Sequence, residues 1–310
     1  MATDIAFSLA ILSLLGARIP LGIKVFLTAF AIADDLGAVV VIALFYTASI
    51  NLSYLGAAGF VLVLLFIANL LWLRHVLTYI VLGVALWVCI LASGIHATVA
   101  GVLVALFIPA KGKYNTDVFV QKVRHYLDPI AFGGQADEDA ILLNKTHLNA
   151  VQAIDLACRD VETPLQRFEH GLQSWIAMGV LPLFALANAG LTVGGLNIGA
   201  AIAHPLTLGV ALGLLLGKPA GISLFTFLSV KLLRTPLMQG ITWRQIVGVS
   251  FLGGIGFTMS LFITGLSFSE PELIEHAKLG VILASVIAAT VGYFLLSTHP
   301  PHSPPTRSEN

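Results

Sequence analysis

Nine apolar stretches constrain this chain more than any other feature. They lie at residues 4–17, 23–47, 54–73, 76–92, 95–108, 174–190, 205–230, 245–268 and 277–297. A helix needs about 20 apolar residues to cross a hydrocarbon core about 30 Å thick. Because backbone groups in lipid must be hydrogen-bonded within the protein, the stretches predict an all-α polytopic membrane protein with about nine spans. The first and fifth are short for a span, which indicates half helices or steeply packed helices.

The composition excludes several classes of function. Of the 310 residues, 57% are hydrophobic and 10% are charged, whereas soluble domains carry about 25% charged residues. The formal net charge is zero, so no nucleic-acid partner is indicated. The cysteines Cys89 and Cys158 match no metal or redox spacing. We find no nucleophile–base set, phosphate loop or metal-ligand spacing, and we expect no enzyme and no cofactor.

The lipid bilayer is the expected partner, and a homodimer is a further candidate assembly.

The basic residues predict an orientation. If the connections alternate between two sides, one side collects nearly all Lys and Arg: Arg18, Lys24, Arg74, Lys231, Arg234, Arg244, Arg307 and seven more between Lys111 and Arg167. The loops on the other side, near 48–53, 93–94, 191–204 and 269–276, hold none. Under the positive-inside rule the basic side is cytoplasmic, together with the C-terminus. We therefore expect a multi-pass membrane protein whose C-terminus is cytoplasmic.

Two adjacent acids, Asp34 and Asp35, interrupt the second apolar stretch. With a rise of about 1.5 Å per residue, they lie roughly 15 Å past Lys24, near the bilayer midplane. An ionised carboxylate costs several kcal/mol there, so intramembrane acids indicate a functional site. The alternative is one interfacial aspartate or a structural hydrogen bond.

Lys218 is the intramembrane cation of the apolar stretch GLLLGKPAGISLF. A lone buried lysine loses its proton or finds a carboxylate partner. Adjacent helical residues point about 100° apart, so only one of Asp34 and Asp35 can face Lys218 squarely. We predict that Asp34 faces Lys218 and Asp35 the ion path, with the reverse assignment left open. The alternative is a lysine that snorkels to a helix end.

Two places have the character of broken helices. Gly253, Gly254 and Gly256 weaken the helix at 245–268, and irregular backbone at membrane depth survives only where it is buried in protein or lines a cavity. Thr3-Asp4 has the pattern of the opening of a second half helix. Broken ends carry partial charges, so Asp4 would suit a positive N-terminus and Lys218 a negative C-terminus. The glycines could instead form a close contact between helices.

The long connection at 110–172 predicts a cytoplasmic loop with short amphipathic helices. Residues 133–139 are typical of a flexible segment, and Leu148, Val151, Ile154 and Cys158 recur at helical spacing. Thr163 to Gln166 form a capping box with proline at the first helical position, so a second helix should start there. The rest of 110–160 is expected to be a solvated connector, and 298–310 a disordered cytoplasmic tail.

Six motifs carry a resemblance to a known family. They are ATDIAF at 2–7, AIADDLGAVVVIALFYT at 31–47, SGIHATVAGV at 93–102, LPLFALANAG at 181–190, GKPAGISLF at 217–225 and GGIGFTMSLFI at 253–263. The chain resembles the NhaA-type sodium/proton antiporters outside the loop at 110–162. The resemblance implies an inverted-repeat fold with two broken helices that cross near the midplane. This family is itself a known example of that architecture among secondary transporters.

The resemblance also implies roles for named residues. Asp34 and Asp35 become the site for Na⁺, Li⁺ and H⁺, Lys218 the partner of Asp34, and Thr3 and Asp4 parts of the crossing. Glu169 and His170 match the family's RxEH element, which is linked to pH activation, whereas Gln173 replaces a further histidine. Family members have twelve spans, so we expect a single transmembrane domain over 1–310 that lacks three leading spans, from a truncated gene, a misplaced start codon or a fragment.

The mechanism that follows is competition for one carboxylate site. Protons occupy the aspartates at low pH, and as pH rises Na⁺ or Li⁺ binds the carboxylate oxygens, which are the ligands that hard cations prefer. The resemblance implies an electrogenic, pH-regulated exchange that expels Na⁺. A cation channel and a non-transporting fragment or assembly subunit remain alternatives. An intramembrane protease would need its two acids on different helices, and Asp34 and Asp35 share one.

Overall fold

The computed structural model describes residues 2–47, 50–111, 116–131, 145–190, 198–234, 237 and 240–298. All regular elements in these ranges are helices, and several are long and apolar enough to cross a membrane. The prediction of helices throughout is therefore confirmed for the described residues, and several of these helices are consistent with a polytopic membrane protein. The chain forms two compact units, unit 1 (Met1–Tyr46 and Leu181–Asn310) and unit 2 (Thr47–Val180), which we describe separately.

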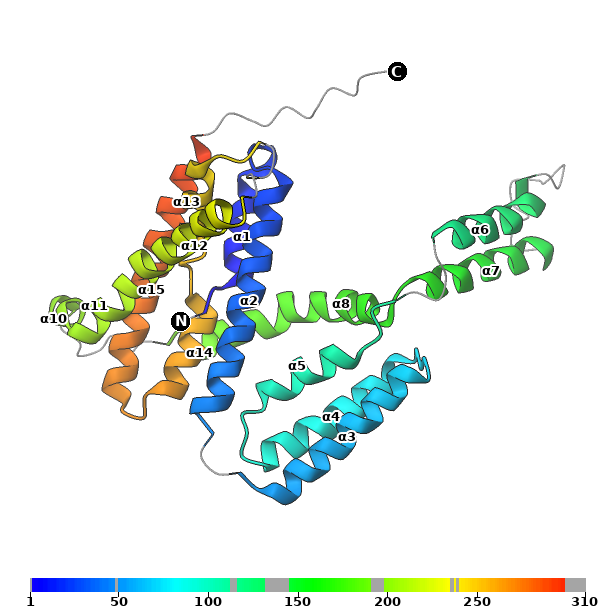
Figure 1. Cartoon of the computed structure of the whole chain (residues 1–310), viewed down its shortest axis with the longest axis horizontal. Coiled ribbons are helices and arrows are strands. Elements are labelled where there is room, and N and C mark those ends of the chain that lie inside the picture. Colours follow the sequence, from blue (N-terminus) through cyan, green and yellow to red (C-terminus); the bar gives the residue numbers. More distant parts are fainter. Residues whose placement is uncertain are drawn as a thin grey trace. The chain divides into compact units, whose positions relative to one another are not determined.

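Unit 1 is built from both ends of the chain (Figure 1). Its elements are α1 (Ile5–Leu14), η1 (Gly16–Arg18), α2 (Leu21–Phe45), α9 (Leu181–Asn188), α10 (Ile198–Ala203), α11 (Pro205–Leu212), η3 (Gly213–Gly217), α12 (Lys218–Leu232), α13 (Trp243–Leu252), α14 (Phe257–Ser267) and α15 (Pro271–Ser297). Unit 2 contains α3 (Leu52–Leu70), α4 (Val76–Ala92), α5 (Thr98–Phe107), α6 (Thr116–Ala131), α7 (Lys145–Val161), α8 (Pro164–Trp175) and η2 (Ile176–Val180).

Each of the nine apolar stretches contains a helix, but their lengths differ. Five helical segments of 19 to 28 residues are long enough to span a membrane. A sixth, α13 with α14, is bent by 48° at its break. The remaining stretches form the shorter helices α1, α4 and α5, of 10, 17 and 10 residues. The number of spans therefore stays a prediction.

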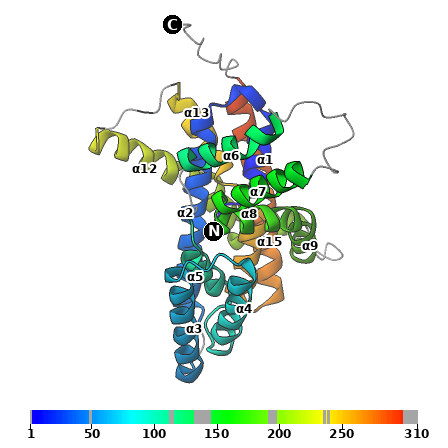
Figure 2. The same ribbon diagram turned by 90° about the vertical axis from the view of Figure 1, so that its right-hand side faces the viewer.

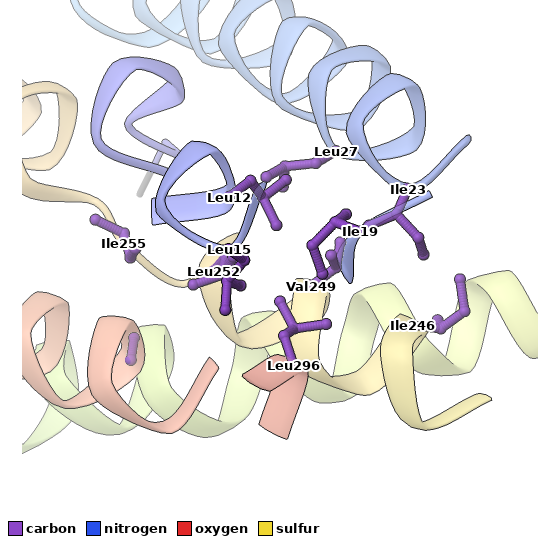
Figure 3. Close-up of a cluster of buried hydrophobic side chains, with 11 residues drawn as sticks. Leu12, Leu15, Ile19, Ile23, Leu27, Ile246, Val249, Leu252, Ile255 and Leu296 are labelled. Carbon is purple, nitrogen blue, oxygen red and sulfur yellow. The ribbon is translucent and has the colours of Figure 1, made fainter. Parts of the chain in front are cut away.

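The main core of unit 1 joins α1, α2, α13 and α15. Leu12 of α1 and Leu15, which follows the helix, pack with Leu27 of α2 and with Val249 and Leu252 of α13 (Figure 3). Aliphatic side chains fill this core, and they pack α1 against α2, α13 and α15. The core therefore supports the two irregular places of unit 1, which are the segment before α1 and the break between α13 and α14.

Small residues let α15 approach its neighbours closely. Gly280, Ala284, Ala288 and Gly292 recur every four residues along one face of the helix. A Cβ at Gly280 would lie 2.7 Å from the carbonyl oxygen of Thr207, and one at Gly292 would lie 2.5 Å from Leu252 Cδ2. Small residues at this spacing are typical of tightly packed membrane helices. As a result α15 forms the support for α11 and α13.

Unit 2 has a simpler core of regular helices. α3 and α4 lie side by side (Figure 2), and Leu65, Tyr79, Leu86 and Ala100 are buried between α3, α4 and α5. The helices α6 and α7 also pack on each other. Unit 2 is thus a set of paired helices around an apolar core.

The long connection is more helical than we predicted. The capping box at Thr163 is confirmed, because Thr163 Oγ1 accepts from the Gln166 N–H at 3.1 Å and Gln166 Oε1 accepts from the Thr163 N–H at 3.1 Å. Helix α7 confirms the amphipathic helix around Leu148. The connector prediction missed α6, whose polar and apolar residues alternate at helical spacing. The predicted flexible segment at 133–139 and the tail from 299 lie outside the described residues.

Candidate functional site

The centre of α2 carries the predicted ion site. Asp34 lies in the middle of this 25-residue helix, and its carboxylate is partly buried. Lys218 Nζ lies 2.6 Å from Asp34 Oδ2, with 14% of the lysine side chain exposed. The structure therefore brings together the lysine and the first of the two acids. The lysine does not snorkel to a helix end.

A local irregularity precedes Lys218. The π-helical turn η3 ends at Gly217, immediately before the lysine. Pro219 has no N–H to donate to the carbonyl of Leu215, so a regular α-helical ladder cannot continue through this position. Such π turns occur often at functional sites. The Gly-Lys-Pro sequence thus explains why the helix changes its winding where the lysine faces Asp34.

Thr3 links Asp34 to the broken helix. Its backbone N–H donates to Asp34 Oδ2 at 2.7 Å, and its hydroxyl oxygen accepts from Lys218 Nζ at 2.7 Å. The same hydroxyl lies 2.7 Å from the carbonyl oxygen of Gly253 and 2.9 Å from Asp34 Oδ2. Oδ2 of Asp34 already accepts from the Thr3 N–H and from Lys218 Nζ, so the single hydroxyl hydrogen of Thr3 is better donated to the carbonyl oxygen of Gly253. Thr3 is fully buried and fixes the site from three directions.

Asp35 differs from Asp34 in its surroundings. Its Oδ1 atom is buried and, among the described residues, has no hydrogen-bond partner. For Asp34, all hydrogen bonds recorded within the described ranges go to Oδ2. Each acid therefore retains a carboxylate oxygen that can accept a proton or a cation.

Two non-helical segments meet beside these acids. Residues 2–4 precede α1, and 253–256 separate α13 from α14. The Asp4 N–H donates to the carbonyl oxygen of Ile255 at 2.6 Å. Figure 1 shows α13 and α14 on either side of this connection, with the N-terminus beside it. The backbone is irregular in both segments, and each segment supplies hydrogen bonds that the other needs.

Asp4 lies at the N-termini of two half helices. Its Oδ1 accepts from the Phe7 N–H of α1 at 3.2 Å, and its Oδ2 accepts from the Thr258 N–H of α14 at 2.9 Å and from the Thr258 hydroxyl. Helix N-termini carry partial positive charge, so one buried carboxylate offsets both. Lys218 is not recorded at a helix C-terminus. Its described partners are Asp34 and Thr3.

Several hydroxyl groups that hold this crossing were missed by sequence reasoning. Ser8 donates to the carbonyl oxygen of Leu252 at 2.8 Å, and Ser260 to that of Ala2 at 3.2 Å. Ser285 of α15 accepts from the Gly256 N–H at 3.3 Å. Serine in an apolar helix is an available signal, but it does not name its partner, because these contacts join residues 29 to 258 positions apart.

Two cavities meet at Asp34. The first, the α14 cavity, has a volume of about 950 Å³ and runs beside α2 from Phe30 to Tyr46, with α14 residues such as Thr264 in its wall. The second, the α12 cavity, has a volume of about 630 Å³ and runs from Asp34 to Phe26, with Lys218 in its wall. The cavities extend in opposite directions along α2, so Asp34 can be approached from both ends of the helix.

The RxEH element, Arg167 to His170, belongs to unit 2, whereas Asp34 and Asp35 belong to unit 1. His170 Nδ1 is 3.5 Å from Glu162 Oε1, and Arg167 Nε is 3.4 Å from Glu162 Oε2. Glu169 is exposed and borders an apolar cavity of about 630 Å³ between α4, α5 and α8. Sequence reasoning named Glu169 and His170 but did not anticipate that Glu162 lies close to both His170 and Arg167.

Comparisons with known proteins agree on one family. The family model described as Na⁺/H⁺ antiporter 1 matches residues 1–296. The chain is 44% identical over 297 residues to Na⁺/H⁺ antiporter NhaA 2 of Syntrophotalea carbinolica, covering 96% of this chain and 67% of the relative. It is 43% identical over 309 residues to NhaA of Phocaeicola vulgatus and 45% over 316 to NhaA of Koribacter versatilis, covering 98% and 99% of this chain and 68% of each relative. The chain thus spans about two thirds of these relatives.

Proposed function

The chain belongs to the Na⁺/H⁺ antiporter 1 family, and from this premise we propose that it exchanges Na⁺ for H⁺ across a membrane. The observation that carries the proposal is the cluster of Asp34, Lys218 and Thr3 beside Asp35 at the crossing of two interrupted helices. A secondary transporter needs a site of this kind at membrane depth, where the charge of a cation can be matched.

Competition between Na⁺ and H⁺ is the proposed mechanism. Asp34 Oδ1 and Asp35 Oδ1 supply two adjacent oxygens, and oxygens are the ligands that Na⁺ and Li⁺ prefer. A proton on either carboxylate removes a ligand, so the two ions exclude each other. When the cation binds, Lys218 can release Asp34, because the cation takes over the neutralisation of its charge. Two carboxylates can exchange two protons for one cation, which would make the exchange electrogenic.

Alternating access is supported by the two cavities. The α12 cavity follows the first half of α2, which starts near Lys24, and the α14 cavity follows the second half. With the basic loops in the cytoplasm, the α12 cavity faces the cytoplasm and the α14 cavity the opposite side. Asp34 would then receive ions from each side in turn. We extend this proposal to an inverted-repeat fold within a single transmembrane domain.

The proposed setting is the inner membrane of a bacterium, with the C-terminus in the cytoplasm. Glu169 and His170 are the proposed pH-responsive residues. Both lie in the same short helix as Arg167, and His170 and Arg167 contact the carboxylate of Glu162. The transported ions are Na⁺, Li⁺ and H⁺, and the carboxylates bind them without a resident cofactor. A homodimer is the proposed assembly.

The test is transport in sealed vesicles. When a Na⁺ gradient is imposed, the 310-residue chain should move H⁺ in the direction opposite to Na⁺ and so change the pH of the lumen. Asp35→Asn should abolish this proton movement while the protein still inserts. Glu270→Gln, at an exposed acid that precedes α15, is the matched control and should retain exchange. Full exchange by Asp35→Asn would refute the carboxylate assignment. Na⁺ flux by the parent chain without a pH change would identify a channel.

A further inference from the structure

Phe30 occupies a special position between the two cavities. It and Asp34 are the residues that line both the α14 cavity and the α12 cavity. They are four residues apart on α2, so their side chains lie on the same face of the helix, one turn apart. The ring of Phe30 also reaches the broken helix, since a Cβ at Gly253 would lie 3.7 Å from Phe30 Cε1.

The walls of the two cavities otherwise differ. The α12 cavity continues to Phe26, one turn before Phe30, and to Gly221 of α12. The α14 cavity continues to Gly37 and Tyr46 in the other direction along α2. Thus Phe30 and Asp34 are shared by the walls of two spaces that are each large enough for water.

An exchanger requires such a boundary to be closed. If hydrated Na⁺ could pass from one cavity to the other, the cation would move without returning protons. A carboxylate alone cannot prevent this passage, because it attracts cations from both sides. An apolar ring can, because a narrow hydrophobic constriction excludes water and raises the cost of moving an ion through it.

We propose that Phe30 is the partition that keeps the two cavities separate and so couples Na⁺ movement to H⁺ movement. The inference rests on the proposed exchange function and adds a residue to it. Asp34 binds the ion, and Phe30 prevents the ion from leaving toward the side opposite to its entry. Phe30 and Asp34 move together on α2, so access changes at a step in which the helices that face the ring of Phe30 shift relative to α2.

The first test compares three phenylalanine variants in vesicles. Phe30→Ala joins the cavities, and Na⁺ flux without proton counterflow should rise by roughly tenfold or more over the parent chain, equivalent to about 1.4 kcal/mol removed from the barrier. Phe30→Val should change the flux in the same direction and serves if the alanine variant does not fold. Phe30→Leu keeps a bulky apolar side chain and should preserve coupling. Phe26→Ala, which enlarges only the α12 cavity, should keep the parent's ratio of Na⁺ to H⁺ movement.

A second test measures the partition without transport. Gly37→Cys and Gly221→Cys place one thiol in each cavity, and neither Cβ meets an atom within 4 Å. In a chain with Cys89→Ser and Cys158→Ser, the small cation Ag⁺ is added from one side, and blocked thiols are scored by later maleimide labelling. Each thiol should react from one side only with Phe30 present, and from both sides in Phe30→Ala.

The outcomes separate this inference from the proposed function. One-sided labelling that persists in Phe30→Ala, with its coupling intact, overturns the partition while exchange by the parent chain stands. A second outcome is two-sided labelling in Phe30→Ala together with no ion exchange by the parent chain. That result supports the partition and refutes the exchange function. A leak of equal size in Phe26→Ala would show that cavity width, and not the ring of Phe30, sets the coupling.

Discussion

The two units bury very different kinds of side chain. In unit 1 the buried polar residues include a carboxylate, a histidine, a glutamine and several hydroxyls: Thr3, Asp4, Ser8, Thr207, Gln245, Ser250, Thr258, Ser260, Thr264, His276 and Ser285. In the described part of unit 2, the buried polar groups are Ser93 and the hydroxyl of Tyr79. The helices of unit 2 are regular, and side chains such as Asn51 and Thr163 cap their ends. Those of unit 1 are interrupted, and side chains satisfy the exposed groups.

This difference indicates which unit carries the chemistry. A buried polar group is costly unless it is hydrogen-bonded, so a protein keeps many of them only where they are used. In unit 1 they hold two half helices in place and position Asp34 and Lys218 beside the break. In unit 2 apolar packing is sufficient. The following predictions test the contrast, from the largest expected effect to the smallest.

Loss of the buried ion pair should have the largest effect on stability. Lys218→Ala leaves Asp34 partly buried without its cation and should lower the free energy of unfolding by about 3–5 kcal/mol. Thermal unfolding in detergent micelles measures the change. The double variant Lys218→Ala with Asp34→Asn should recover much of the loss, because the unpaired charge is removed. A double variant as unstable as the single one would mean that the lysine acts by packing rather than by charge.

Glycine substitutions should have opposite signs in the two units. A Cβ at Gly254 would lie 2.5 Å from the carbonyl oxygen of Leu214, so Gly254→Ala forces the backbone apart and should cost about 3 kcal/mol. Gly56 of α3 has no atom within 4 Å of such a Cβ, so Gly56→Ala should stabilise its helix by roughly 0.5–1 kcal/mol. The same melting assay decides. Tolerance of alanine at Gly254 would show that the break is less tightly packed than the structure indicates.

Single hydroxyl deletions should be costlier in unit 1. Thr258→Val removes a hydrogen bond to the carboxylate of Asp4 and should cost about 2 kcal/mol, since bonds to charged groups are the stronger ones. Ser93→Ala removes a neutral bond to the carbonyl oxygen of Ile90 and should cost about 1 kcal/mol. Equal losses, measured by chemical denaturation of both variants, would contradict the idea that Asp4 organises unit 1 electrostatically.

The exposed ion pair of unit 2 should matter least for stability. Arg167 and Glu162 are about one third exposed, so Arg167→Ala should change the free energy of unfolding by less than about 1 kcal/mol. The variant should instead shift the pH at which exchange begins, because Arg167 and His170 contact the same carboxylate. A pH profile identical to that of the parent chain would remove this element from the proposed regulation.

Much of this arrangement could be predicted from local sequence. Hydropathy located the long apolar helices because lipid demands length and low polarity, but it missed the short helix α10, which lies in the predicted loop at 191–204. Three glycines in four residues identified the break, and neutralisation of charge paired Lys218 with Asp34. These predictions use the properties of one segment, or the attraction between two opposite charges in apolar surroundings.

What the sequence could not provide depends on packing between distant segments. The hydrogen bond from the Gly256 N–H to Ser285 requires α15 to pass beside the break. The two cavities, and the position of Phe30 between them, exist only once α2, α12 and α14 are assembled. Helix α6 was missed for another reason. Mean hydropathy is low in this polar loop, so α6 is visible only in the helical spacing of its apolar residues, which was used for α7 but not for 116–131.

The most direct test of the central claim is the Na⁺ dependence of exchange at several pH values. If Na⁺ and H⁺ compete for the carboxylates of Asp34 and Asp35, the half-saturating Na⁺ concentration should rise roughly tenfold per pH unit of acidification for each proton displaced. The maximal rate at saturating Na⁺ should change much less. A half-saturating concentration that stays constant while the maximal rate falls would contradict a shared site.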